Sequence, residues 1–268
     1  MRDPFAIVLP FFNEERFLGA TLASLAAQTR APNRIILVDN ASSDASPEIA
    51  RAFAAANGAL NVEVRREAQP GKASALACGL AGVTGGLVAT CDADTHYPPH
   101  YLDRAERLFA ERPEIAAVIA FGVASPDPEA SVAVRAKGRA MALLAPRQTH
   151  GGGYGEAFRA DALHAAGGFS PARWPYCLMD HEIMHRIVRD GGALGYAFDH
   201  WCVPSARRGD RKRVRWTLGE RLFYHVVPLS RRDWFFYDFL APRFARRRLG
   251  ELALREQPWS TPETNSPG

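Results

Sequence analysis

The sequence lacks several features that would place it in a familiar class at once. No apolar run comes near the ~20 residues that span a bilayer, since the longest, from Phe5 to Phe12, is followed by polar residues. The four cysteines have no Cys-x-x-Cys spacing, which predicts free core thiols rather than a disulfide framework or a zinc site. The first residues do not resemble a signal peptide. These absences predict a cytoplasmic protein.

Lysine is scarce, because only Lys72, Lys137 and Lys212 stand against 30 arginines. A lysine inside a motif is therefore more informative here than usual. The net charge of +4 is also unevenly distributed. Residues 204–256 contain 14 Arg and Lys against 6 Asp and Glu, whereas the rest of the chain contains 19 against 23. A basic segment of this kind predicts an anionic partner.

Two common nucleotide-binding motifs are missing as well. No G-x-G-x-x-G follows the first apolar run and no G-x-x-x-x-G-K-[ST] occurs anywhere, which argues against a Rossmann dehydrogenase and a P-loop NTPase. Strands are instead predicted at 5–9, 34–38, 61–66, 86–91 and 115–123, with helices at 18–25, from about Ser46 onward, at 73–83 and at 98–111. This alternation predicts an α/β fold with a mostly parallel central sheet flanked by helices. Further helices are expected at 131–144 and 180–189.

The segments that follow these strands carry the chemistry. In an open parallel sheet, ligands bind beyond the carboxyl ends of the strands. Those ends are followed here by residues 10–14, residues 39–44 and Asp92-Ala93-Asp94. Residues two apart in an extended segment point the same way, so Asp92 and Asp94 can face one divalent cation. The alternative is that they only cap the helix that follows.

The ordered set of motifs resembles the family 2 glycosyltransferases, which have the GT-A fold. The matching segments are Pro10 with Asn13-Glu14, Val38-Asp39 with Ser42-Ser43-Asp44, Gly71-Lys72 with Ala75-Leu76, Asp92-Ala93-Asp94, Gly155 to Arg159 with Gly167-Gly168-Phe169, and Asp180-His181-Glu182 with Arg186. The resemblance covers about residues 5 to 200. It implies a GT-A glycosyltransferase domain over 1–203, with a nucleotide-sugar half at about 1–95 and an acceptor half at 96–203.

The resemblance also assigns a nucleotide-sugar site. It would consist of Pro10, Glu14, Asp39, Asn40, Lys72, Asp92, Ala93 and Asp94. Within it, Asp92 and Asp94 would hold Mg²⁺ or Mn²⁺ on the donor diphosphate, and Asp39 would contact the base. Asn40 and Ala41 stand where the family usually has Asp and Gly, so the identity of the nucleotide base in the donor is left open. A UDP-sugar is favoured, and a GDP- or TDP-sugar is possible.

Asp180 is the candidate catalytic base. The family has a Glu-Asp pair at the start of a helix, and its Asp removes the proton from the acceptor hydroxyl; here the pair reads Met179-Asp180. Glu182 is a weaker candidate. From the residues alone, an Asp that opens an amphipathic helix is commonly an N-cap. Three histidines are available as a further metal ligand, and none is assigned: His150, His200 and His225.

These expectations describe an inverting glycosyltransferase that moves a sugar from a nucleotide-diphosphate sugar to a hydroxyl acceptor, which is a glycan, a lipid-linked molecule or a small molecule. Two alternatives remain open. A sugar-1-phosphate nucleotidylyltransferase uses a similar sheet, but its G-x-G-x-R loop is absent. A non-catalytic nucleotide-sugar-binding protein would keep the pocket and lose the base, and the missing Glu before Asp180 leaves that possibility open.

The C-terminal residues form a separate segment. Residues 204–257 predict a basic, aromatic helical extension, and 258–268 a disordered tail. The aromatic piece at 231–240, flanked by arginines, is typical of a segment at an anionic membrane surface, which would place the protein peripherally on the inner face of the membrane. The alternatives are that the aromatics form ordinary core, or that Arg207 and Arg208 bind the donor diphosphate. No nucleic-acid reader motif accompanies the charge, so no nucleic acid is expected.

Overall fold

A computed structural model describes residues 3–127, 129, 131–205 and 216–255. The predictions for Arg207 and Arg208, and for the tail at 258–268, lie outside the described residues. Within the described ranges, no helix combines the length and the apolar character needed to cross a membrane.

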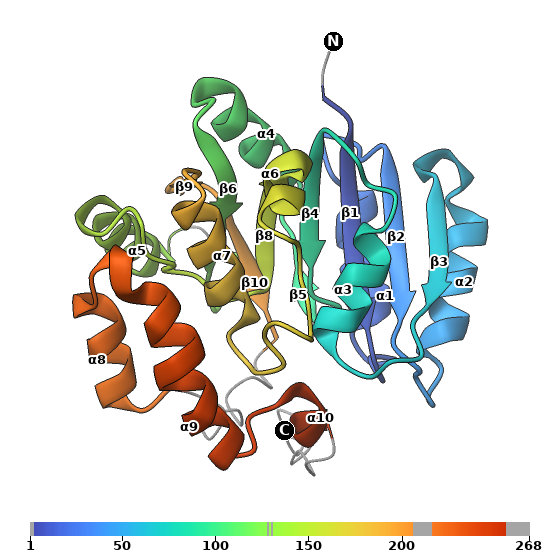
Figure 1. The fold of residues 1–268 in the computed structure, drawn as a ribbon. Helices are drawn as coiled ribbons and strands as arrows, with labels where there is room; N and C mark the ends of the chain where they lie inside the picture. The colour runs from blue at the N-terminus through green and yellow to red at the C-terminus, as the bar shows by residue number, and fades with distance from the viewer. Residues whose placement is uncertain (1–2, 128, 130, 206–215, 256–268) are drawn as a thin grey trace, which may run out of the picture.

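A seven-stranded sheet forms the centre of the molecule, with strand order β3-β2-β1-β4-β8-β6-β9 (Figure 1). Its strands are β1 Phe5–Phe11, β2 Arg34–Asp39, β3 Val62–Arg66, β4 Leu87–Cys91, β6 Ile115–Ile119, β8 Gly155–Arg159 and β9 Ala193–Gly195. All pairs are parallel except those of β8, which runs antiparallel to both β4 and β6. The predicted α/β fold with a mostly parallel sheet is therefore confirmed, and β8 makes the sheet mixed.

The apolar run at 115–123 is not one strand, contrary to the prediction. The chain changes partner at Ala120, whose N–H donates to the carbonyl of Gly155, whereas the N–H of Phe121 donates to the carbonyl of His200. β7 Phe121–Gly122 then joins a small second sheet of order β5-β10-β7, with β5 Thr95–His96 and β10 Trp201–Pro204. An apolar run cannot reveal this switch, because both partners bury the same kind of side chain.

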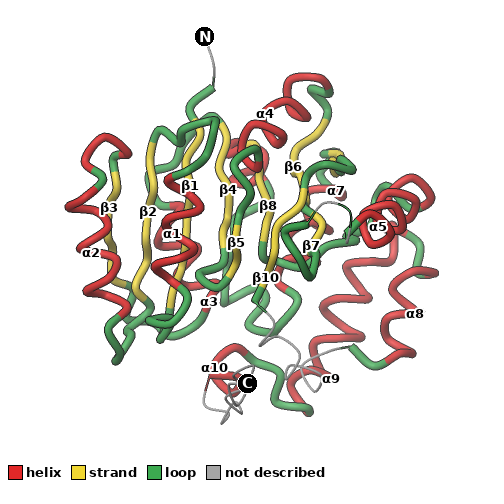
Figure 2. Tube along the Cα trace, turned by 180° about the vertical axis from the view of Figure 1, so that it is seen from behind, coloured by secondary structure: helices red, strands yellow, loops and turns green. Residues whose placement is uncertain are grey.

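Helices cover both faces of the central sheet, as Figures 1 and 2 show from opposite sides. Alternate residues of β1 point to opposite faces, so Ile7 packs into one hydrophobic cluster and Val8 into the other. The first cluster contains residues of α1, α2 and α4, and the second contains residues of α3, α6 and α7. The helices are α1 Leu18–Ala26, α2 Ser46–Ala56, the 3₁₀ turn η1 Gly58–Leu60, α3 Lys72–Leu80, α4 Tyr101–Glu111, α5 Val132–Leu144, α6 Ala160–Ala165 and α7 Met179–Arg189.

The described part of the C-terminal segment is helical and has a core of its own. Its elements are α8 Leu218–Val226, the 3₁₀ turn η3 Leu229–Arg231, the π-helix η4 Trp234–Leu240, α9 Ala241–Arg246 and α10 Glu251–Arg255. Phe235, Phe236 and Phe244 are fully buried there, packed against Trp174 from the segment before α7. Most of the aromatic piece at 231–240 is thus core packing, and only Trp234 is largely exposed.

Candidate active site

A pocket of about 610 Å³ opens where β1, β2 and β4 end. Eight of the nine predicted site residues line it: Pro10, Glu14, Asn40, Lys72, Asp92, Ala93, Asp94 and Asp180. Asp39 is the exception. It lines a second pocket of about 570 Å³, and its Oδ1 accepts the N–H of Ser42 at 2.8 Å. The structure therefore brings the predicted residues together apart from the proposed base contact, which faces another cavity.

The loops after β1 and β2 hold one another in place. Asn13 Oδ1 accepts the N–H of Ser43 at 2.8 Å, and the N–H of Glu14 donates to Ser46 Oγ at 2.7 Å. Asn13 and Ala41 adopt left-handed backbone conformations, with φ of +53° and +59°. At Ala41 this conformation is the one that a glycine, the family's usual residue, adopts without strain.

Asn40 has a structural reason to be an amide. Its Nδ2 donates to the carbonyls of Glu67 and Gln69 at 3.1 and 2.8 Å, while its Oδ1 accepts the N–H of Gly71 at 2.8 Å. An aspartate could accept from Gly71 but could not donate to the two carbonyls. The departure from the family's usual Asp therefore fits the hydrogen bonds that tie β2 to the start of α3.

Lys72, the first residue of α3, reaches across the pocket. Its Nζ lies 2.5 Å from Asp92 Oδ1 and donates to the carbonyl of Gly153 at 2.8 Å. Asp94 Oδ2 accepts the hydroxyl hydrogen of Ser205 at 2.8 Å. One lysine thus joins the acidic motif to the glycine loop at 151–153.

Asp92 and Asp94 fit a divalent cation shared with a diphosphate. Among the described residues, no cluster of three or more His, Cys, Asp and Glu side chains has the arrangement of a metal site. Mg²⁺ commonly takes only one or two protein carboxylates and completes its shell with phosphate oxygens and water. Two carboxylates lining one pocket match that requirement. The three candidate histidines make other contacts: His200 stacks on Tyr101, His150 contacts the carbonyl of Ala145, and His225 contacts Gln148.

Asp180 lies in the first turn of α7 and is 7% exposed. It is not the N-cap, which is Leu178. Burial by itself would raise the pKa of Asp180, but the charge and hydrogen bonds of His181, whose Nδ1 is 3.2 Å from Asp180 Oδ1, together with Lys72, lower the pKa below its usual value. The buried Glu156 on β8 shows the opposite: burial, and then Asp180, raise its pKa well above the usual range. The two carboxyl groups are therefore shifted in opposite directions, with the pKa of Asp180 lowered and that of Glu156 raised.

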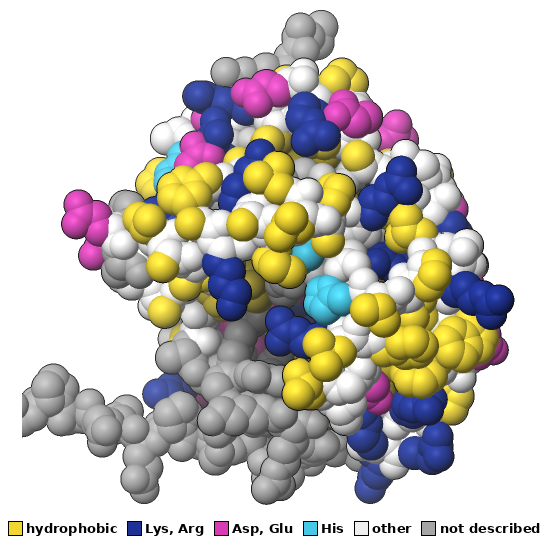
Figure 3. Space-filling model, turned by 90° about the vertical axis from the view of Figure 1, so that its left-hand side faces the viewer, with side chains coloured by type: hydrophobic (Ala, Val, Ile, Leu, Met, Phe, Trp, Pro, Cys, Tyr) yellow, Lys and Arg dark blue, Asp and Glu magenta, His cyan; other side chains and the backbone are white. Residues whose placement is uncertain are grey.

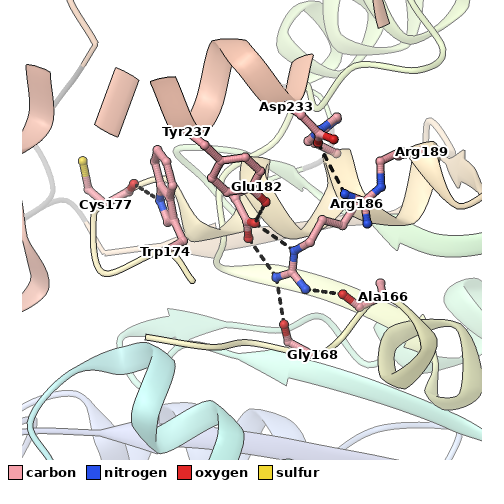
Figure 4. A network of polar contacts seen from close by, with 10 residues as sticks. Ala166, Gly168, Trp174, Cys177, Glu182, Arg186, Arg189, Asp233 and Tyr237 are labelled. Atoms are coloured by element: carbon pink, nitrogen blue, oxygen red, sulfur yellow. Dashed lines mark hydrogen bonds and ion pairs between the residues drawn. The ribbon is translucent and has the colours of Figure 1, made fainter. Parts of the chain in front are cut away.

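Glu182, the weaker candidate base, belongs to a buried network behind the site (Figure 4). Both of its oxygens accept from the guanidinium of Arg186 at 2.8 Å, and one also accepts from the hydroxyl of Tyr237 at 2.5 Å. Arg186 donates as well to the carbonyls of Ala166 and Gly168. Glu182 does not line the pocket, and the network anchors η4 to the helix that carries Asp180.

Sequence reasoning missed two residues of α10 that line the pocket. The guanidinium of Arg255 lies 3.3 Å from the ring centroid of Phe12 and donates to Asn40 Oδ1 at 2.9 Å. Glu251 accepts the N–H of Ala73 at 3.1 and 3.2 Å, and burial raises its pKa to about 7. No motif marks either residue, and the basic charge of the extension predicted only an anionic partner.

Comparison with known proteins is consistent with this geometry. The profile of Glycosyl transferase family 2 matches residues 6–164. The undecaprenyl-phosphate 4-deoxy-4-formamido-L-arabinose transferase of Sodalis glossinidius (strain morsitans) is 37% identical over 112 residues, which are 41% of this chain and 34% of that protein. The protein of the same name from Serratia proteamaculans (strain 568) is 36% identical over 109 residues, which are 40% of this chain and 33% of that protein. The matched segment thus spans about a third of these relatives.

Two solved structures share the fold over nearly the whole chain. The mannosyltransferase PcManGT from Pyrobaculum calidifontis, in complex with GDP-Man and Mn²⁺, has a TM-score of 0.65 at 23% identity and covers 95% of this chain and 75% of that one. TarS 1-349 from S. aureus has a TM-score of 0.60 at 14% identity, also covering 95% of this chain and 75% of that one. At these identities the similarity shows a GT-A-like fold.

Proposed function

Because the chain belongs to glycosyl transferase family 2, we propose that it transfers a sugar from a nucleotide-diphosphate sugar to a hydroxyl acceptor with inversion at the anomeric carbon. One observation carries this proposal: the segments after β1, β2 and β4 and the first turn of α7 converge on a single pocket. A donor in that pocket would lie beside Asp92, Asp94 and Lys72, with the buried Asp180 in the same pocket.

The donor side of the pocket suits a nucleoside diphosphate. The segment from Pro10 to Glu14, with Asn40, would hold the nucleoside, and Lys72 lies beside the acids that face the diphosphate. Mg²⁺ or Mn²⁺ held by Asp92 and Asp94 would neutralise the charge of the leaving diphosphate. Since Asp39 lines the second pocket, the identity of the nucleotide base is less constrained than the family pattern implies. A UDP-sugar is the first choice, with GDP- and TDP-sugars to be compared.

On the acceptor side, Asp180 would remove the proton of the attacking hydroxyl. His181 and Lys72 lower the pKa of Asp180. Gly153 packs closely against Asp180, because a Cβ added to Gly153 would lie 3.1 Å from the Asp180 Cβ. Displacement from the face opposite the diphosphate needs no second nucleophile, which is why inversion follows.

The acceptor itself is proposed from two considerations. The curated relatives are named for transfer to undecaprenyl phosphate, which makes a lipid-linked acceptor the first candidate. A lipid phosphate is already ionised at neutral pH and needs no general base, whereas a hydroxyl does. A buried, ionised Asp180 therefore favours a hydroxyl, such as that of a lipid-linked sugar; glycans and small molecules are the other candidates.

Nucleoside diphosphate release from UDP-, GDP- and TDP-sugars tests the proposal. We expect metal-dependent release from one donor, because transfer to water occurs even without acceptor. Asp180→Asn should lose it, whereas Asp190→Asn, an acid at the end of the same helix, should keep it. Pyrophosphate formed from a nucleoside triphosphate and a sugar 1-phosphate would instead indicate a nucleotidylyltransferase. Tight donor binding without release in the presence of acceptor extracts would indicate a binding protein.

A further inference from the structure

One side of the molecule exposes an unusual amount of apolar surface. Seven of the ten large apolar side chains that the described residues expose belong to α5 and α8, and these seven are between 46% and 81% exposed. They are Val132, Val134, Leu143, Leu144, Leu218, Leu222 and Val226. We call the surface of these seven side chains the α5–α8 face. Exposed apolar residues are common singly, but such a concentration usually marks a contact surface.

Helix α8 is apolar on two sides. Its inner side buries Tyr224, which packs in the core of the C-terminal segment. Leu218, Leu222 and Val226 are spaced four residues apart and therefore form one outward stripe. A helix that only covered a core would carry polar residues at those positions.

Helix α5 joins the same surface. The side chain of Gln148, just after α5, donates to the carbonyl of His225 at 3.2 Å and contacts its ring, so the end of α5 is held against the end of α8. Arg232 donates to the carbonyl of Arg147 at 2.9 Å. Figures 1 and 2 both place α5 and α8 on the same side, and Figure 3 looks onto it, where hydrophobic side chains are interspersed with basic ones.

Cations outnumber acids around this face. Residues 131–155 contain no Asp or Glu, and residues 216–232 contain only Glu220, which is buried and paired with Arg247 at 2.7 Å. Four exposed cations lie in these stretches: Lys137, Arg147, Arg221 and Arg231. Exposed acids lie only at the borders of these stretches: Glu129 precedes α5, and Asp233, which is bonded to His185, follows η3. Apolar side chains framed by an excess of cations complement a surface with anionic headgroups above a hydrocarbon layer.

We propose that the α5–α8 face docks on an anionic phospholipid bilayer, with α8 lying in the interface. This replaces the aromatic piece at 231–240, whose rings are largely buried, as the membrane contact. The inner side of α8 leads to the active site, because the rings of Trp216 and Tyr224 lie 5.1 and 5.8 Å from that of His181, the neighbour of Asp180. Docking would hold a lipid-linked acceptor near the base; that consequence rests on the proposed function, whereas docking does not.

Co-sedimentation with vesicles tests the docking. Wild-type protein is mixed with phosphatidylcholine vesicles with and without phosphatidylglycerol, at low and high salt. We expect binding only to the anionic vesicles, weakened by salt. The double variant Leu222→Glu with Val226→Glu should bind at least tenfold more weakly. The control Ala52→Glu with Ala55→Glu adds the same charge to exposed positions of α2, and should stay within about twofold of wild type.

Three results would overturn the proposal. The first is that wild-type protein does not bind anionic vesicles at low salt. The second is that both double variants lose vesicle binding to the same extent. The third is that the α8 variant changes from dimer to monomer in sedimentation velocity while its vesicle binding is unchanged. The last would assign the face to a second copy of the chain. Nucleoside diphosphate release is measured in parallel, so failure of docking and failure of the proposed reaction are separate observations.

A second, independent observation concerns α10. Arg255 stacks on Phe12 and bonds to both the side chain and the carbonyl of Asn40, the latter at 2.6 Å. Both carboxylate oxygens of Glu251 accept the N–H of Ala73, the second residue of α3, next to Lys72. The guanidinium on the aromatic ring and the carboxyl group at the start of α3 take up contacts that a nucleotide base and a phosphate would use.

We infer that α10 is a displaceable plug of the donor pocket, an inference that rests on the proposed function. If only molecules with α10 displaced can bind the ligand, the apparent affinity falls in proportion to the fraction of molecules in that open state. Calorimetric titration with UDP and GDP in the presence of Mn²⁺ tests this. Arg255→Ala should bind several-fold more tightly than wild type, and Arg246→Ala, an exposed arginine of α9, should not differ. Equal or weaker binding by Arg255→Ala would overturn the plug. Binding by neither protein would overturn the donor site itself.

Discussion

Replacement of Arg186 by methionine is the sharpest test of how the catalytic helix is held. Arg186 and Glu182 are almost fully buried, with side chains 1% and 2% exposed. Methionine fills much of the space of the arginine stem but donates no hydrogen bond. The variant therefore leaves a buried carboxylate with Tyr237 as its remaining partner, and it removes donors from the carbonyls of Ala166 and Gly168.

The magnitude follows from those contacts. Breaking one partner out of a buried ion pair commonly costs about 3–5 kcal/mol, because the other charge stays in a low-dielectric site. We expect Arg186→Met to lower the free energy of unfolding by about 4 kcal/mol. Urea denaturation followed by circular dichroism measures this change. Because a typical domain is stable by only about 5–15 kcal/mol, the effect will be plain.

A second variant separates the stranded charge from lost packing. Glu182→Gln with Arg186→Met carries no buried charge and still offers an oxygen to Tyr237. We expect it to recover about half of the loss, or about 2 kcal/mol. A loss below about 1 kcal/mol in Arg186→Met, or no recovery in the double variant, would refute the account of a desolvated ion pair holding α7.

Three further predictions concern the pocket. Asn40→Asp places a carboxylate against two carbonyls, so we expect the free energy of unfolding, measured by urea denaturation, to fall by about 2 kcal/mol and the thermal midpoint to fall with it. Asn57→Asp, at a half-buried residue outside the pocket, should cost less. The pKa of Glu251 is raised to about 7, so the folded state binds more protons than the unfolded state between pH ~4.5 and 7. Stability should therefore fall across that range as pH rises, by at most about 3 kcal/mol, and Glu251→Gln should remove this slope. Lys72→Met removes the ion pair between Lys72 and Asp92, and we expect the Mn²⁺ concentration needed for half-maximal release of nucleoside diphosphate to change by about tenfold. EDTA should abolish this release from the wild-type protein.

The sequence by itself determined the central part of the fold and most of the site. The apolar runs of β1, β2 and β4 are continuous because both faces of these strands are buried. Such burial can be predicted from consecutive residues of the sequence alone. The carboxyl ends of parallel strands meet at one edge, so the segments after them were expected to converge. Asp92 and Asp94 line one pocket accordingly, together with Lys72 and Asp180, which the family resemblance implied.

Tertiary structure alone decided where chemically similar residues end up. The aromatic piece at 231–240 has the composition of a membrane contact, yet most of its rings pack with Trp174 in a hydrophobic core. The aliphatic stripe of α8 remains exposed instead. Arg255 reaches Asn40 across 215 positions of the chain. Such pairings depend on how distant elements pack, and local patterns of apolar and polar residues record which side of an element is buried but not which partner buries it.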